Sequence, residues 1–166
     1  MRPSPITNAD FEVAEKILHL TARASVAIWH LITQHTRAVA DITGMQASVL
    51  MTLIAGRCTT STELARQYAL NPSVITGHVD GLEQHGFVKR VPSEFDRRVH
   101  LIVPTDEGRG LFGKISPVFS RVLGEVFDGL ESEEIEAFQN SLQRMVLKAG
   151  MADVGAESKL FRLGVA

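Results

Sequence analysis

A stripe of mostly apolar positions recurs at alternating spacings of three and four between about Asn8 and Ala40. The stripe comprises Phe11, Ala14, Leu18, Thr21, Ser25, Ile28 and Ile32, and Ile17, Ala24 and Leu31 widen it. This period predicts one long amphipathic helix. Neither glycine nor proline interrupts it. Because the stripe is longer than a small domain requires, we expect it to pack against a partner subunit.

A second helix is expected to begin after a cap at Thr43 and to end near Ala55, where Gly56 suits a C-terminal stop. Its buried side is expected to comprise Val49, Leu50, Leu53 and Ile54. Thr60 and Glu63 then have the spacing of a capping box, in which each side chain accepts a backbone N–H of the first turn. The helix that follows is short and is expected to end near Tyr68.

The fourth predicted helix has two distinct faces. Asn71 is a favoured N-cap, and Pro72 suits the first helical position because no N–H is needed there. The inward face is expected to comprise Ile75, Val79 and Leu82, and the outward face Ser73, Thr76, Gly77 and Asp80. Gly86 is expected to end this helix.

A β-hairpin is expected directly after Gly86. One strand begins with Phe87, Val88 and Val91, and the return strand comprises residues 100–103. The connection over residues 92–98 is polar and charged. Thr105 then caps a fifth helix that runs towards Leu130, and Ser132 starts a sixth with acidic residues in its first turn.

Length and composition indicate the size of the folded unit and the cellular compartment. The chain has 166 residues, which fits one compact unit with an appended dimerisation region. No apolar run reaches the roughly 18 residues that a membrane-spanning helix needs, and residues 1–5 lack the core of a signal peptide. The single cysteine cannot form an internal disulfide, which suits a reducing compartment. We therefore expect a cytoplasmic protein that does not enter a membrane.

A winged DNA-binding module consists of two short helices followed by a basic hairpin, and the predicted elements occur in this order. The small side chains on the outward face of the fourth helix let its backbone approach a major groove closely. The hairpin supplies four cations against Glu94 and Asp96, whereas the net charge of the chain is −2. The candidate DNA-binding residues are Ser73, Thr76, Gly77, His78, Lys89, Arg90, Asp96, Arg97 and Arg98.

Arg98 is the candidate for a narrow minor groove, whose negative potential attracts arginine. Asp96 lies two residues earlier, and we expect it to hold the guanidinium of Arg98 extended. The predicted fold class is therefore mainly α with a small β-hairpin wing: a winged helix-turn-helix whose N- and C-terminal helices form a dimerisation region.

Over roughly residues 10 to 148 the chain resembles the MarR family of bacterial winged helix-turn-helix regulators. The matching pieces are Thr43-Gly44-Met45-Gln46, Val49-Leu50, Glu63-Leu64-Ala65, Val74-Ile75-Thr76, Val79-Asp80, Leu82-Glu83, Gly86-Phe87-Val88, Arg90, Asp96-Arg97-Arg98 and Thr105-Asp106-Glu107-Gly108. The resemblance implies a homodimer with interlocking first, fifth and sixth helices, a recognition helix beginning near Pro72, and a wing arginine, here Arg98, in the minor groove. Two departures concern the base contacts: Gly77 stands where family members often have a basic residue, and the wing is short.

The expected organisation has four parts. Residues 1–42 form an N-terminal dimerisation region, residues 43–104 the winged helix-turn-helix domain, residues 105–148 the C-terminal dimerisation helices, and residues 149–166 a tail of uncertain order. A twofold dimer of this kind reads a pseudo-palindromic operator in double-stranded DNA. The expected function is that of a repressor, and a non-specific or architectural DNA-binding protein is the alternative.

The resemblance also implies release from DNA by a small effector such as an aromatic acid, a phenol, a drug, a metal or an oxidant. His19 and Arg23 are one turn apart on the first predicted helix, and His30 lies close to the same side. A buried arginine beside a histidine could clamp a carboxylate. The alternative is that Arg23 pairs with an acid across the dimer and that the histidines are partly exposed.

Other chemistry has less support. Cys58 is either an oxidation sensor or a small packed hydrophobe. Six histidines are present, but none has the spacing of a metal site, so we expect no metal and no cofactor. The chain has no phosphate-binding glycine loop, nucleophile elbow or zinc-protease motif, so we expect no enzyme. A protein-interaction module that has lost DNA binding is a further alternative, for which Gly77 is the only indication.

Overall fold

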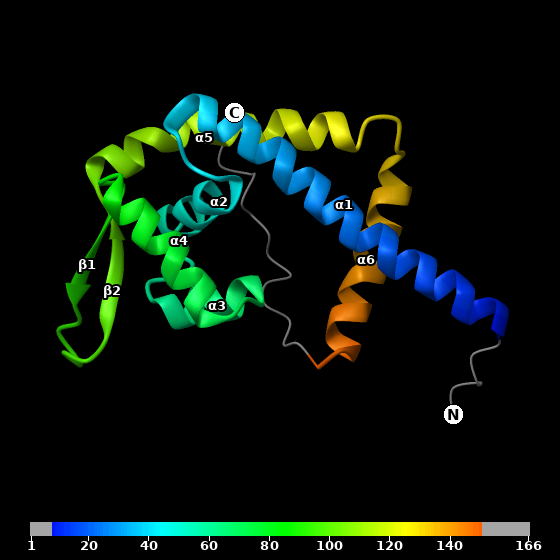
Figure 1. Cartoon of the computed structure of the whole chain (residues 1–166), viewed down its shortest axis with the longest axis horizontal. Coiled ribbons are helices and arrows are strands. Elements are labelled where there is room, and N and C mark those ends of the chain that lie inside the picture. The colour runs from blue at the N-terminus through cyan, green and yellow to red at the C-terminus, as the bar shows by residue number, and fades with distance from the viewer. Residues whose placement is uncertain (1–7, 151–166) are drawn as a thin grey trace.

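A computed structural model describes residues 8–150, in which six helices accompany one two-stranded antiparallel sheet (Figure 1). The elements are α1 (Asn8–Ala40), α2 (Gly44–Ile54), α3 (Ser61–Tyr68), α4 (Pro72–Gln84), β1 (Val88–Pro92), β2 (His100–Pro104), α5 (Asp106–Val126) and α6 (Ser132–Lys148). The predicted fold, mainly helical with one hairpin, is confirmed. Beyond Gly150, the tail expected over residues 149–166 lies outside the described residues.

Local hydrogen bonds explain where the second and third helices begin. The hydroxyl of Thr43 accepts the N–H of Gln46 at 3.2 Å, and Gln46 Oε1 accepts the N–H of Thr43 at 2.8 Å. Thr60 and Glu63 form the same reciprocal pair, at 3.2 Å and 3.1 Å. These capping boxes satisfy N–H groups that a helix start leaves without partners. Both predicted starts are confirmed.

The hydrophobic core lies around α2, whose residues 47–53 are all buried. A helix that is hydrophobic on every side is stable only when other elements surround it. The inward face of α4 supplies Ile75, Val79 and Leu82, each completely buried, as the sequence predicts. From α5 come Leu111, Ile115, Val118, Phe119 and Val122. The inward face of α4 is therefore fixed by packing against the core, whereas its opposite face is exposed to solvent.

The start of α5 is joined to the hairpin by close backbone contacts. The N–H of Thr105 donates to the carbonyl oxygen of Phe87 at 3.0 Å, and the Thr105 hydroxyl donates to the carbonyl oxygen of Gly86 at 2.6 Å. The same hydroxyl accepts the N–H of Gly108 at 3.1 Å. A Cβ on Gly108 would overlap the carbonyl oxygen of Phe87. Only glycine allows α5 to begin this close to β1.

The N-terminal part of α1 and helix α6 lie at the end of the molecule away from the hairpin (Figure 1). Both helices carry exposed apolar side chains. On α1, between residues 11 and 26, they are Phe11, Val13, Ile17, Leu18, Leu20 and Val26, and on α6 they are Phe138, Met145, Val146 and Leu147. We call these residues the apolar end face. None of the side chains of α6 is buried within residues 8–150.

Candidate nucleic-acid interface

Helix α4 presents a small polar face to solvent. Asn71 caps it, since Asn71 Oδ1 accepts the N–H of Ser73 at 3.0 Å. The Ser73 hydroxyl donates to the same oxygen at 2.9 Å, and the Thr76 hydroxyl donates to the carbonyl oxygen of Pro72 at 2.9 Å. Both hydroxyl groups therefore have a partner in the free chain but keep accepting lone pairs, and they must rotate to donate to DNA.

Gly77 lies in the middle of this exposed face, and a Cβ added there would meet no atom within 4 Å. Internal packing therefore gives no reason for glycine at this position, although glycine lowers helix stability. The lack of a side chain leaves the backbone of α4 open to close approach from outside the chain.

Beside α4, the hairpin presents a hydrogen-bonded tip. Residues Val88–Pro92 of β1 pair with Pro104–His100 of β2. Across the tip, the N–H of Ser93 donates to the carbonyl oxygen of Val99, and the N–H of Val99 donates to the carbonyl oxygen of Asp96, both at 2.9 Å. Residues 94–100 are all exposed. The side chains of Arg97 and Arg98 form no salt bridge within the described part of the chain.

Asp96 acts differently from our expectation. Its Oδ1 accepts the backbone N–H of Arg98 at 2.9 Å, and no hydrogen bond to the Arg98 guanidinium is found among residues 8–150. A carboxylate that bonds the backbone two residues on is typical of an Asx turn. The prediction that Asp96 holds the guanidinium extended is wrong for the free chain. Asp96 instead shapes the turn from which the Arg98 side chain projects.

The side chain of Arg90 is partly buried and forms salt bridges within the protein. Its Nη2 lies 2.6 Å from Asp80 Oδ1, and its Nη1 bonds Glu83, both acceptors being on α4. Partial burial opposes the positive charge, but the bonds to Asp80 and Glu83 outweigh it and raise the pKa of Arg90. Lys89, by contrast, is exposed. Arg90 therefore connects the recognition helix to the first strand of the hairpin, a contact that sequence spacing alone does not indicate.

His78 is partly buried on α4, and burial lowers its pKa because the charged imidazolium loses hydration. The imidazole is therefore neutral at pH 7 in the free chain. Of the nine candidate DNA-binding residues, seven are exposed on α4 or on the wing, and the other two, His78 and Arg90, are partly buried. Among these nine, Arg90 alone forms salt bridges to other described residues. One residue of the tip, Phe95, was missed by our interpretation although it interrupts a polar segment.

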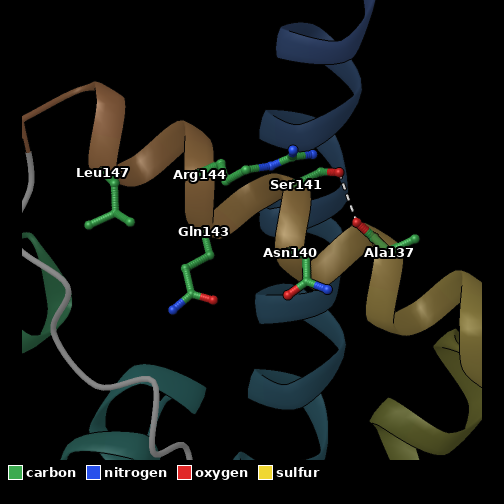
Figure 2. A pocket seen from close by; sticks show the side chains of 6 residues that line it. All are labelled: Ala137, Asn140, Ser141, Gln143, Arg144 and Leu147. Carbon is green, nitrogen blue, oxygen red and sulfur yellow. Dashed lines mark hydrogen bonds between the residues drawn. The ribbon is translucent and has the colours of Figure 1, made fainter.

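The candidate effector residues lie elsewhere. His19, Arg23 and His30 are all exposed on α1, so the buried arginine that we expected is not found in the single chain. His30 Nε2 lies 3.0 Å from the side-chain nitrogen of Gln34. An open hollow lies on α6 instead and is lined by Ala137, Asn140, Ser141, Gln143, Arg144 and Leu147 (Figure 2). None of the three candidates lines it.

Cys58 is buried, and desolvation raises the pKa of its thiol, with Glu63 adding to the effect. A raised pKa leaves little reactive thiolate, so the packing role is favoured over the sensing role. Among residues 8–150 no three histidine, cysteine, aspartate or glutamate side chains are placed to hold a metal ion. In the same residues no helix is long and apolar enough to cross a membrane.

A helix pair with an exposed recognition face, followed directly by a hairpin with an arginine-bearing tip, defines the winged helix-turn-helix class of DNA-binding proteins. Residues 42–100 match the family model described as the MarR family. Over these residues, which span α2 to the start of β2, the chain is similar to the MarR family of winged helix-turn-helix transcriptional regulators. The resemblance found in the sequence is thereby confirmed.

Named relatives agree with this assignment. Over 50% of its length, the chain is 30% identical to the HTH-type transcriptional regulator YwhA of Bacillus subtilis. The alignment spans 59% of that relative's own length.

Solved structures extend the likeness to the whole fold. The structure of a cysteine-to-serine mutant of MarR from Escherichia coli, complexed with operator DNA, has a TM-score of 0.73 at 21% identity and covers 82% of this chain and 97% of its own. The structure of CouR from Rhodococcus jostii RHA1, bound to p-coumaroyl-CoA, has a TM-score of 0.67 at 25% identity. It covers 78% of this chain and 90% of its own.

Proposed function

We propose that this protein is a ligand-responsive transcriptional repressor that binds a pseudo-palindromic operator as a homodimer. The observation that carries the proposal is the small polar face of α4 beside the ordered wing tip with Arg97 and Arg98. A major groove admits one helix, and the neighbouring minor groove attracts arginine. The MarR structure complexed with operator DNA, which has the same fold, supports this binding mode.

In the proposed complex, Ser73, Thr76 and Gly77 face the major groove, and Arg98 enters the minor groove. Lys89 and Arg97 contact phosphates, which position the protein without reading sequence. The net charge of −2 means that attraction to DNA comes from this one face. The other faces are repelled and therefore orient the approach.

The apolar end face supports the proposal of a homodimer. Most of the stability of a helix in a protein comes from packing of its apolar face, and α6 has no buried side chain in the described part of the chain. We propose that residues 1–42 and 105–148 form the dimerisation region and that residues 43–104 form the DNA-binding domain. A twofold dimer places two α4 helices about 34 Å apart, in successive major grooves.

For the effector we propose a small aromatic acid or phenol. CouR was solved with p-coumaroyl-CoA, which carries an aromatic group and negative charges. Arg23, with His19 and His30, is our proposal for the carboxylate clamp. Since all three are exposed on the single chain, a second subunit has to supply the opposite wall. Calorimetry with a panel of benzoates on wild type and Arg23→Ala tests the clamp, and equal binding by both would refute it.

Footprinting on the region upstream of the protein's own gene tests the main proposal. A regulator protects a defined site and prefers it to random duplex by at least about a thousandfold. Nearly equal affinity for every duplex would instead indicate the non-specific or architectural alternative. The effector is then the compound that releases the protein from its footprint.

A further inference from the structure

The side chain of Phe95 is completely exposed, at 100%. No other large hydrophobic side chain among the described residues is as exposed, and the next is Val26 at 71%. A phenylalanine ring stabilises a folded chain when it is removed from water. Because the ring of Phe95 remains fully in water, it adds no such stabilisation to the free chain.

The position of Phe95 is nevertheless well defined. Its N–H donates to the hydroxyl oxygen of Ser93 at 3.2 Å, and Ser93 is itself bonded to Val99 across the tip at 2.9 Å. On the other side of Phe95, Asp96 holds the turn through the N–H of Arg98. The ring is therefore presented outward by an ordered turn, at the outermost part of the wing.

The surroundings of the ring point to nucleic acid. Phe95 lies between Glu94 and Asp96, with Arg97 and Arg98 directly after them. A protein partner would need an apolar patch, but apart from Phe95 itself and Val99 the exposed residues 94–100 are polar or charged. An isolated aromatic ring beside two arginines suits a surface that is anionic outside and apolar inside. The minor groove of DNA has this character, since deoxyribose and base edges lie beneath the phosphates.

We infer that Phe95 is a DNA-contacting residue that enters the minor groove beside Arg98 and partly unstacks one base step. This inference rests on the proposed function and adds the kind of contact that the wing makes. Pyrimidine–purine steps such as TA are the most easily unstacked. The wing therefore reads the deformability of the step beneath it, in addition to attracting phosphate.

The test uses the full-length protein and duplexes that it selects from a random pool. Phe95→Asn removes the apolar ring, Phe95→Leu keeps an apolar side chain, and Glu94→Gln is the matched control on the same tip. We expect Phe95→Asn to lose roughly tenfold in affinity and Phe95→Leu to lose less. The slope of log K against log salt is expected to stay unchanged in Phe95→Asn, because no charge is lost.

The fluorescence of 2-aminopurine reports unstacking directly when the base is placed at successive steps beneath the wing. We expect it to rise at one step with wild type and Glu94→Gln but not with Phe95→Asn. Replacing a TA step there by a stiff A-tract is expected to weaken wild type and leave Phe95→Asn nearly unaffected. Wild-type affinity in Phe95→Asn, or loss of affinity without any unstacking signal in wild type, would overturn this inference alone. Failure to select any duplex would overturn the proposed function as well.

Discussion

Arg90 of β1 bonds Asp80 of α4 at 2.6 Å, across the junction between the recognition helix and the wing. Glu83, one helical turn beyond Asp80, binds the other side of the same guanidinium. Glu83 Oε1 also accepts the backbone N–H of Arg90 at 3.1 Å. These contacts couple the direction of the strand to the direction of the helix. The two surfaces that we propose to enter neighbouring grooves are therefore held at a defined angle.

Arg90→Met removes this connection, and we expect weaker operator binding with an unchanged salt slope, because the wing is misplaced but no phosphate contact is lost. Stability is expected to fall by no more than about 1 kcal/mol, since the paired groups are partly exposed. Lys89→Met is the matched control, because Lys89 is exposed on the same strand, and it is expected to reduce the slope by about 1. Titrations at several salt concentrations measure both. A slope that falls with Arg90→Met would show that Arg90 contacts phosphate after all.

Arg98→Ala is expected to weaken operator binding by about 1 to 3 kcal/mol, the range for a lost specific contact. Asp96→Ala is expected to cause part of the same loss, because the turn beneath Arg98 loses its hydrogen bond to the Arg98 N–H. Gel-shift titrations at moderate salt measure both variants. Unchanged affinity in Arg98→Ala would refute the assignment of the wing.

Gly77→Ala is expected to change folding and binding in opposite directions. Alanine in a helix interior is more stable than glycine by about 0.5 to 1 kcal/mol, and the added methyl group meets no atom of the chain. The same methyl group separates α4 from the groove, so we expect affinity to fall by about tenfold. Thermal unfolding and operator titration of one preparation give both values. Unchanged affinity would contradict the proposed close approach of the α4 backbone.

Gly108→Ala and Gly110→Ala form a matched pair on the first turns of α5. The new methyl group at Gly108 overlaps the carbonyl oxygen of Phe87, and backbone cannot move aside cheaply. We expect a loss of about 3 kcal/mol in the free energy of unfolding. At Gly110 a Cβ meets nothing within 4 Å, so a gain of about 0.5 to 1 kcal/mol is expected. Urea denaturation separates the two, and equal effects would argue against the joint between α5 and β1.

Glu63 links folding to pH. The N–H of Thr59 donates to Glu63 Oε2 at 2.7 Å, and this bond is the main reason why the pKa of Glu63 lies below its ordinary value of 4.5. The unfolded chain therefore binds the proton first as the pH falls. The stabilisation is complete above the ordinary value and disappears as the pH falls through the lower pKa of the folded state.

Glu63→Gln is accordingly expected to lower the free energy of unfolding at pH 7 and to match wild type near pH 2. The difference at pH 7 is expected to be about 0.5 kcal/mol, small because the carboxylate is exposed to solvent. Glu136→Gln controls for the loss of one negative charge. A difference that persists unchanged at pH 2 would refute the role of the charge.

Features that depend on a few neighbouring residues could be predicted from the sequence. The starts after Thr43, Thr60 and Asn71 depend on hydrogen bonds within three residues, and the inward face of α4 follows from helical period. The partners of Arg90 could not be predicted, because Asp80 and Glu83 approach it only when β1 lies against α4.

The state of Arg23 could not be predicted either, for a different reason. The helical period places Arg23 near apolar residues of α1, but burial requires a surface to cover them, and the single chain has none at that end. At the tip, spacing correctly brought Asp96 close to Arg98. It could not distinguish a bond to the backbone N–H from a bond to the guanidinium.

The joint at Gly108 also has a mechanical consequence. Helix α5 has 21 residues and is therefore about 30 Å long, with its first turn fastened to the backbone at Gly86 and Phe87. This first turn and the start of the hairpin therefore move as one unit, so that a displacement of the turn carries the arginine-bearing tip with it.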